Sequence, residues 1–167
     1  MELTVRIAPD PVLAAVAAAV DPSDPSVLAL ADALVAMMQA APGCVGIAAP
    51  QVGASVRLFV LDVTGARRVE SCHGLVVLCN PVIEARSGKE VRREGCLSVP
   101  DLTGDVARST ELTVSGTVPG TGASRTVVSD AFEARALQHE IDHLDGLLFL
   151  DRVAGAHALF ARKNYLS

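Results

Sequence analysis

The chain has 167 residues, of which 50% are apolar and 20% are charged, so it can bury enough surface to fold and is not intrinsically disordered. A net charge of −5, four Phe, one Tyr and no Trp exclude a typical nucleic-acid binder, which needs basic patches and aromatic platforms. We see no direct nucleic-acid motif, and the length predicts a single domain spanning residues 1–167.

The sequence gives no indication of export or of membrane insertion. The short apolar segment 12–20 follows Glu2, Arg6 and Asp10 rather than the basic cluster that a secretory signal needs. The charge-free stretch 33–56 contains proline, glycine and glutamine, whose polar groups would be unsatisfied in hydrocarbon. The four cysteines are expected to be reduced thiols. We therefore expect a cytoplasmic protein that does not enter a membrane.

The first long element expected is an N-terminal helix. An Ala-rich piece that follows Asp10 is expected to form at most a short helix, and residues 21–25 form a loop. The longer helix has Asp24 as its N-cap and Pro25 as its first residue, and Gly43 lies just past its end. Its apolar residues recur at helical spacing: Val27, Leu30, Leu34, Met37, Met38 and Ala41.

Several short strands are expected in the middle of the chain. Three stretches are rich in aliphatic or β-branched residues: 45–49, 56–63 and 75–79. Pro81 is expected to close the third of these strands. Residues 111–118 alternate polar and apolar side chains and can pair with residues 124–129 as a hairpin around the turn at 119–122.

A second helix is expected over residues 131–144, with Asp130 as its N-cap. The fold class is therefore α+β, with short antiparallel β-sheets packed around this C-terminal helix and one further helix near the N-terminus. One stripe of the C-terminal helix carries four residues: Phe132, Ala136, His139 and His143.

The C-terminal helix contains the pattern His-Glu-x-x-His. His139 and His143 lie one turn apart and can share a metal ion, while Glu140 is rotated by about 100° and can reach a water molecule beside it. The alternative is a pair of buried histidines on an amphipathic helix.

A catalytic zinc-type site needs a third protein ligand. Phe149 stands where one class of zinc endopeptidases has its third histidine, and no glutamate follows Glu140 to serve a second class. Cys96 is the attractive candidate, although a cysteine is also often simply buried. The remaining candidates lie downstream: Asp145, Asp151 and His157.

Gln51 is the one long polar side chain in an apolar run of small residues. Its amide could donate to a developing oxyanion, and the alternative is a solvated glutamine in a turn. The small residues before it would let another backbone approach closely.

Three segments, read together, resemble the motifs of the peptide deformylases. They are Cys-Val-Gly-Ile-Ala-Ala-Pro-Gln at 44–51, Glu-Gly-Cys-Leu-Ser at 94–98 and Gln-His-Glu-Ile-Asp-His-Leu-Asp-Gly at 138–146. The resemblance extends from residue 9 to residue 152. Members of this family remove the N-formyl group from N-formylmethionyl nascent peptides at the ribosome and release formate.

The resemblance implies a divalent metal, Fe²⁺ in the native enzymes, with Zn²⁺, Ni²⁺ or Co²⁺ in some preparations. It implies Glu140 as the general acid and base, and Gln51 with the backbone N–H of Leu97 as the oxyanion hole. The metal ligands that it implies are Cys96, His139 and His143.

The resemblance also implies the substrate site. The peptide backbone would pair with Val45 and Gly46, and the methionine side chain would enter an apolar pocket. That pocket would include four residues: Val45, Leu97, Phe132 and Ala136.

Three positions depart from the family pattern and concern peptide binding rather than catalysis. Cys44 replaces a glycine, Ala14 stands where an arginine is usual, and Thr103 lies near a position where many members have an arginine. Two other functions stay open at this point, a zinc endopeptidase and a non-catalytic peptide-binding protein of the same fold.

Overall fold

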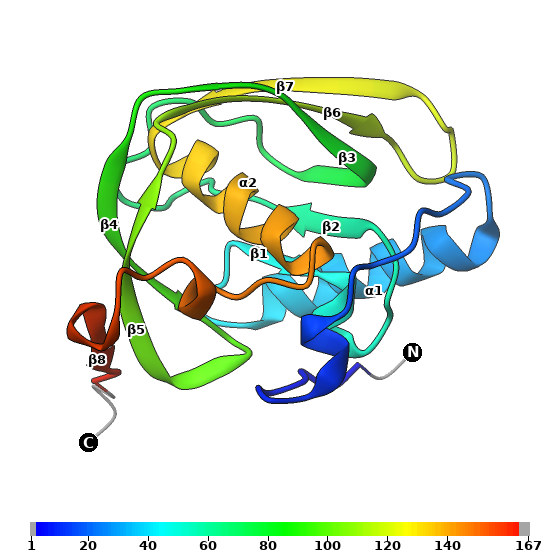
Figure 1. Ribbon diagram of the computed structural model, residues 1–167. Coiled ribbons are helices and arrows are strands. Elements are labelled where there is room, and N and C mark those ends of the chain that lie inside the picture. Colours follow the sequence, from blue (N-terminus) through cyan, green and yellow to red (C-terminus); the bar gives the residue numbers. More distant parts are fainter. Residues whose placement is uncertain (1–2, 164–167) are drawn as a thin grey trace.

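The computed structural model describes residues 3–163, shown in Figure 1. The fold is α+β, as predicted, and short 3₁₀ turns such as η1 (Pro11–Ala14) and η2 (Ala49–Val52) connect its parts. The helices and strands are α1 (Pro25–Ala40), β1 (Gly46–Ala48), β2 (Leu58–Leu61), β3 (Val76–Ser87), β4 (Glu90–Cys96), β5 (Val99–Arg108), β6 (Glu111–Thr117), β7 (Ser124–Asp130), α2 (Ala131–Leu144) and β8 (Leu159–Ala161).

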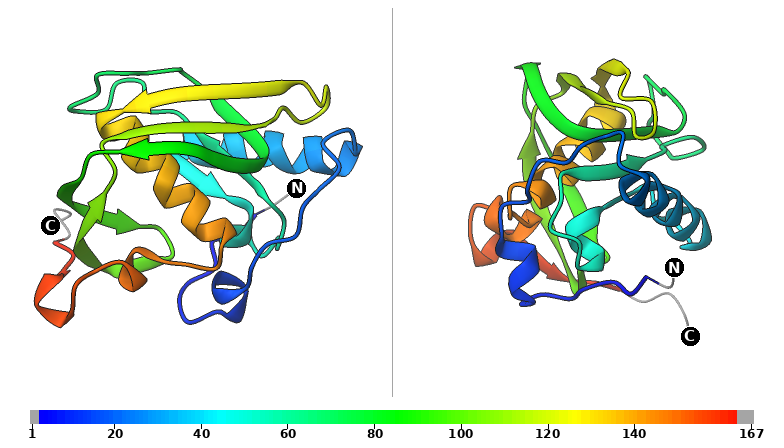
Figure 2. Two further views of the ribbon diagram at one scale, coloured as in Figure 1. Left: turned by 45° about the horizontal axis from the view of Figure 1, so that its top comes forward. Right: turned by 90° about the vertical axis from the view of Figure 1, so that its right-hand side faces the viewer.

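Two antiparallel sheets surround α2. One has the strand order β1-β2-β3-β6-β7 and the other has the order β4-β5-β8. Figures 1 and 2 show α2 running between them, with the long strands β3, β6 and β7 arching over one side. As a result α2 is buried on most of its surface, and Leu137 and Leu144 are fully buried against the larger sheet.

Helix α1 begins and ends as its sequence predicts. The Asp24 side chain accepts a hydrogen bond from the backbone N–H of Ser26 (2.8 Å), and Pro25 is the first helical residue. Gly43, just beyond the end, has a positive φ of 73°. The apolar face packs on β2 through Val27, Leu34 and Met38, among others. Within residues 3–163, no helix combines the length and the apolar character needed to cross a bilayer.

The prediction that Pro81 closes a strand is wrong. β3 continues to Ser87, and its pairing with β6 shifts register between Cys79 and Val82. A bulge at this place leaves the proline nitrogen outside the ladder, so the missing N–H costs no hydrogen bond. Asn80 adopts a positive φ of 50° there, and its side chain binds the backbone of Val20.

Asp130 is the N-cap residue of α2, as predicted, but its side chain makes no capping hydrogen bond. Asp130 is the last residue of β7, and its carboxylate accepts from the backbone N–H of Ser71 (2.9 Å) instead. The predicted β6–β7 hairpin itself forms, and its register runs from Glu111 opposite Asp130 to Thr117 opposite Ser124. The strand thus runs into α2 without a loop and fixes where that helix starts.

Candidate active site

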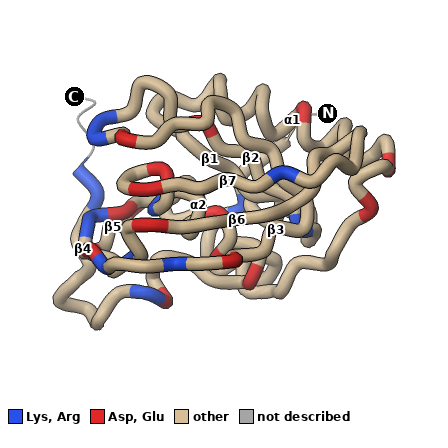
Figure 3. Tube along the Cα trace, turned by 90° about the horizontal axis from the view of Figure 1, so that it is seen from above, with Lys and Arg blue, Asp and Glu red and all other residues tan. Residues whose placement is uncertain are grey.

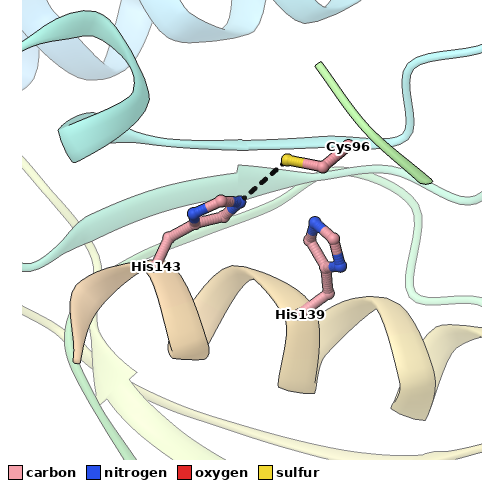
Figure 4. A group of neighbouring side chains, drawn as sticks. All are labelled: Cys96, His139 and His143. Atoms are coloured by element: carbon pink, nitrogen blue, oxygen red, sulfur yellow. Dashed lines mark hydrogen bonds between the residues drawn. The ribbon is translucent and has the colours of Figure 1, made fainter. Parts of the chain in front are cut away.

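Cys96, His139 and His143 form a compact group in the centre of the molecule. The ligating atoms of the three side chains lie within 4.8 Å of one another. Cys96 Sγ is 3.3 Å from His143 Nε2, and the two imidazole rings meet edge to face with centroids 5.1 Å apart. Figure 4 shows both rings rising from α2 toward the sulfur. The helical spacing of the histidines thus produces the convergence that the sequence predicts.

The β4–β5 hairpin delivers the thiol. Cys96 ends β4 and pairs with Val99, so only Leu97 and Ser98 form the turn. The register of the hairpin shifts between Gly95 and Cys96, and such a bulge re-aims the side chain that follows it. The shift places Cys96 toward α2, where it is 5% exposed.

Glu94 fixes the orientation of His139. One carboxylate oxygen lies 2.9 Å from His139 Nδ1, while Arg108 donates two hydrogen bonds of 2.9 Å and Arg135 donates one of 2.7 Å. Burial alone would raise the pKa of Glu94, but the Arg108 and His139 hydrogen bonds outweigh it and hold that pKa far below its usual range. The fixed carboxylate keeps the proton of His139 on Nδ1 and leaves Nε2 facing Cys96.

A chain of buried charges continues behind Glu94. Asp142 accepts from Arg108, and the guanidinium of Arg152 grips the same carboxylate with bonds of 2.7 and 3.1 Å. These ion pairs hold Arg108 in place and thereby fix the Glu94 carboxylate that binds His139. The sequence alone did not predict the roles of Arg108 and Arg152, because the residues around an arginine do not indicate which carboxylate it will pair with in the fold.

Glu140 lies beside the group and is 4% exposed. Within the part of the chain that is described, its Oε2 atom and His143 Nδ1 are buried and have no protein hydrogen-bond partner. Burial raises the pKa of Glu140 to about 7, despite the neighbouring charge of His139. Burial likewise lowers the pKa of His143 well below its usual value. A buried carboxylate oxygen without a hydrogen-bond donor indicates that a water molecule or a cation lies next to it.

The group fits a divalent metal ion. A thiol and two imidazoles are a donor set that suits Fe²⁺ or Zn²⁺, and three protein ligands leave a position open for water. Burial disfavours the charged form of His139, yet its hydrogen bonds to Cys96 and to the Glu94 carboxylate raise its pKa well above the usual value. The site therefore favours a positive charge at this point.

Gln51 is buried, which excludes the alternative of a solvated glutamine. It lies in η2 and is 2% exposed. Its Oε1 accepts from the backbone N–H of Ala48 (2.9 Å), so its amide nitrogen is oriented toward Cys96 Sγ at 3.4 Å and Ser98 Oγ at 3.3 Å. The donor that the sequence singled out thus faces the metal ligands.

A cavity of about 390 Å³ opens from the cluster to the surface. It brings together every residue that the sequence assigned to the substrate. Besides Gln51, Cys96, His139 and Glu140, its walls include Val45, Gly46, Leu97, Phe132 and Ala136.

The three departures from the family pattern lie in different places. Cys44 lines the cavity and donates to the Gly46 carbonyl (3.3 Å), and burial raises its pKa to about 11, so it stays a neutral thiol. Thr103 lies opposite Gly95 on β5, and a guanidinium from elsewhere, that of Arg162, reaches the cavity wall there. Ala14 lies in η1, outside the cavity lining.

Gly46→Ala is expected to reduce hydrolysis by at least about tenfold while the bound metal is kept. A Cβ atom at this position would lie 2.6 Å from Glu140 Oε1 and 2.8 Å from its Cδ, so the carboxylate must move. A displacement of about 1 Å in a catalytic group costs up to roughly a hundredfold. The measurement is kcat together with metal content, and unchanged kcat would show that Glu140 tolerates the shift.

Comparison with known proteins gives one consistent result. The family model described as Polypeptide deformylase matches residues 3–158. A peptide deformylase of Halothermothrix orenii is 46% identical over 151 residues, which are 90% of this chain and 93% of the relative. The crystal structure of a peptide deformylase from Thermotoga maritima superimposes with a TM-score of 0.82 at 35% identity, covering 93% of this chain and 99% of that one.

A third comparison concerns a protein with a bound peptide. A class I type b peptide deformylase from Acinetobacter baumannii, bound to Met-Ala-Ser, has a TM-score of 0.81 at 35% identity and covers 92% of this chain and 99% of that one. A family match over nearly the whole chain, together with relatives of this identity, establishes the assignment. The chain belongs to the peptide deformylase family.

Proposed function

We propose that this chain hydrolyses the formamide bond of N-formylmethionyl peptides and releases formate and a free N-terminus. The observation that carries the proposal is the convergence of Cys96 Sγ and the two histidine rings next to the unpartnered Glu140 carboxylate, at the base of a largely apolar cavity. Family membership supports the same reaction.

Cys96, His139 and His143 would hold the metal, which we propose to be Fe²⁺ in the cell, with Zn²⁺, Ni²⁺ or Co²⁺ able to replace it in preparations. When bound, the ion supplies a lowered pKa of water and polarisation of the formyl oxygen. Glu94, held by Arg108 and Arg135, keeps the imidazole of His139 in the ligating orientation.

Three protein groups near the cluster would carry the proton transfer and the stabilisation of negative charge. Glu140 takes the proton of the attacking water and passes it to the departing amine, for which its raised pKa suits it. The amide of Gln51 and the backbone N–H of Leu97 donate to the oxygen on which negative charge develops.

The substrate is held by backbone and by apolar contacts. The edge of β1 at Val45 and Gly46 can pair with the extended peptide, and the methionine side chain would occupy the part of the cavity lined by Leu97, Phe132 and Ala136. The relative that binds Met-Ala-Ser supports a peptide as the ligand. We infer that the natural substrate is the nascent chain at the ribosome, in the cytoplasm, and that residues 1–167 act as one catalytic domain.

The test is formate release from an N-formyl-Met-Ala-Ser peptide by anaerobically prepared, metal-assayed protein, with product masses recorded. We expect formate in equal amount to deformylated peptide. Cleavage of internal bonds in an unformylated peptide would indicate an endopeptidase instead. Binding of the peptide without formate would indicate a non-catalytic relative.

Gln51→Leu is expected to lower kcat by roughly a hundredfold to a thousandfold and to leave metal content and KM nearly unchanged. The buried amide faces the ligands and not the apolar pocket, so its contribution increases as the oxyanion forms. Steady-state kinetics separates this role from ground-state binding. A raised KM with wild-type kcat would assign Gln51 to peptide binding.

A further inference from the structure

Arg162, which follows the last strand of the described chain, places its positive charge on the wall of the cavity. β8 pairs with β5, placing Phe160 opposite Thr103, and the backbone N–H of Arg162 donates to the carbonyl of Asp101 (2.9 Å). Arg162, which follows this strand, lines the same cavity as Cys96 and His139. In Figure 3 the described chain ends in a blue segment close to β4.

The Arg162 guanidinium covers Gly95. A Cβ atom at position 95 would lie 2.2 Å from Arg162 Nη2 and 3.5 Å from the Thr103 methyl carbon, so the missing side chain makes room for the guanidinium. Gly95 directly precedes Cys96. The cation therefore lies on the cavity wall beside the metal centre, toward the solvent.

The other cations of this wall already have partners. The Nε atom of Arg93 donates to Asp105 (2.7 Å), and its guanidinium stacks on the Phe160 ring at 3.6 Å. Arg135 donates to Glu94 and to the carbonyls of Val106 and Glu90.

Arg162 differs from them. None of the ion pairs formed within residues 3–163 includes it. The two carboxylates in the cavity lining are Glu94, which is bound to Arg108, Arg135 and His139, and Glu140, which lies at the metal end. A guanidinium that pairs with no carboxylate of residues 3–163, on the wall of a substrate cavity, is a site for an anionic group.

We propose that Arg162 is a specificity-determining residue that binds the acidic side chain of the second or third residue of the formylated peptide. The inference rests on the proposed function. With the formyl group at the cluster and methionine in the apolar pocket, an extended chain advances about 3.3 Å per residue along the wall and passes Gly95 within one or two residues. A glutamate or aspartate there meets the guanidinium, whereas a lysine meets a like charge.

The experiment compares kcat/KM for amidated N-formyl-Met-Ala-Glu, its Gln and Lys counterparts, and N-formyl-Met-Glu-Ala. We expect the better of the two Glu peptides to exceed the Gln peptide by about fivefold, mainly through KM, as for a partly exposed ion pair that contributes equally to ground and transition states. Arg162→Gln should bring this ratio to about one, and Arg162→Glu should turn the preference toward the Lys peptide. High salt should weaken the wild-type preference.

Lys163→Gln is the matched control, because it removes the same charge from the neighbouring exposed residue, which is outside the cavity lining. This variant should keep the wild-type ratio. Equal losses in the two variants, or a wild-type ratio of about one for both Glu peptides, would overturn the role of Arg162. Failure of the neutral Gln peptide to release any formate would instead overturn the proposed function.

Discussion

Glu140→Gln is expected to lose roughly 10⁴-fold or more of its formate release, at or above the top of the range for general acid and base catalysis, while it keeps its metal. Glutamine preserves the size of the side chain but cannot accept a proton from the attacking water. One residue serves both the attack and the departure of the amine, so both steps suffer. The structure supports this double role, because Glu140 Oε2 is buried without a protein partner and is free for this use.

The two readouts of Glu140→Gln separate catalysis from metal binding. Glu140 is not among the three converging ligands, so metal content should remain near that of the wild type. Retention of more than roughly a tenth of wild-type formate release would contradict the assignment, since it is far outside the expected range. Loss of metal together with activity would instead make Glu140 a ligand.

Cys96→Ala is expected to lose most of the bound metal and with it the activity. The substitution removes one of three ligands, and even changes to groups that only support a ligand typically weaken metal affinity by about 10- to 100-fold. We therefore expect affinity to fall by more than about a hundredfold, measured by competition with a chelator.

Cys72→Ala is the control for Cys96→Ala. Cys72 is an exposed free thiol, whereas Cys96 is buried beside His143. The control should keep both metal and activity. Stoichiometric metal in an active Cys96→Ala protein would show that the ligand set is wrong.

The centre of the site could be predicted from sequence because its parts are local. The spacing of His139 and His143 on a helix determines that they share a face, and Gln51 was the one long amide in an apolar segment. The partnership of these segments with Cys96 came from the resemblance, since no local rule brings residue 96 to residue 139.

The support around the site was not predictable in the same way. Glu94 lies in a recognised motif, but its partners Arg108 and Arg135 are 14 and 41 residues away. They meet Glu94 only when β4 pairs with β5 and α2 packs against the hairpin. Arg162 reaches the cavity for a similar reason, through the pairing of β8 with β5.

The long β4–β5 hairpin also escaped prediction. The exposed positions of β4 carry charged residues such as Arg92 and Arg93, and β5 contains Pro100 and Gly104, so neither strand shows the simple alternation that marks one. Pro81 led to an incorrect prediction of where β3 ends. A bulge let the strand continue past a residue that normally ends one.

The most direct test of the account is reconstitution of the metal-free protein with Co²⁺ or Fe²⁺ under anaerobic conditions, with formate release measured at each addition. Activity should rise in proportion to the metal and level off at about one ion per chain, because one cluster holds one ion. Co²⁺ should also produce a thiolate-to-metal absorption band that Cys96→Ala lacks. Formate release that is independent of added metal, or full activity without the thiolate band, would contradict the central claim.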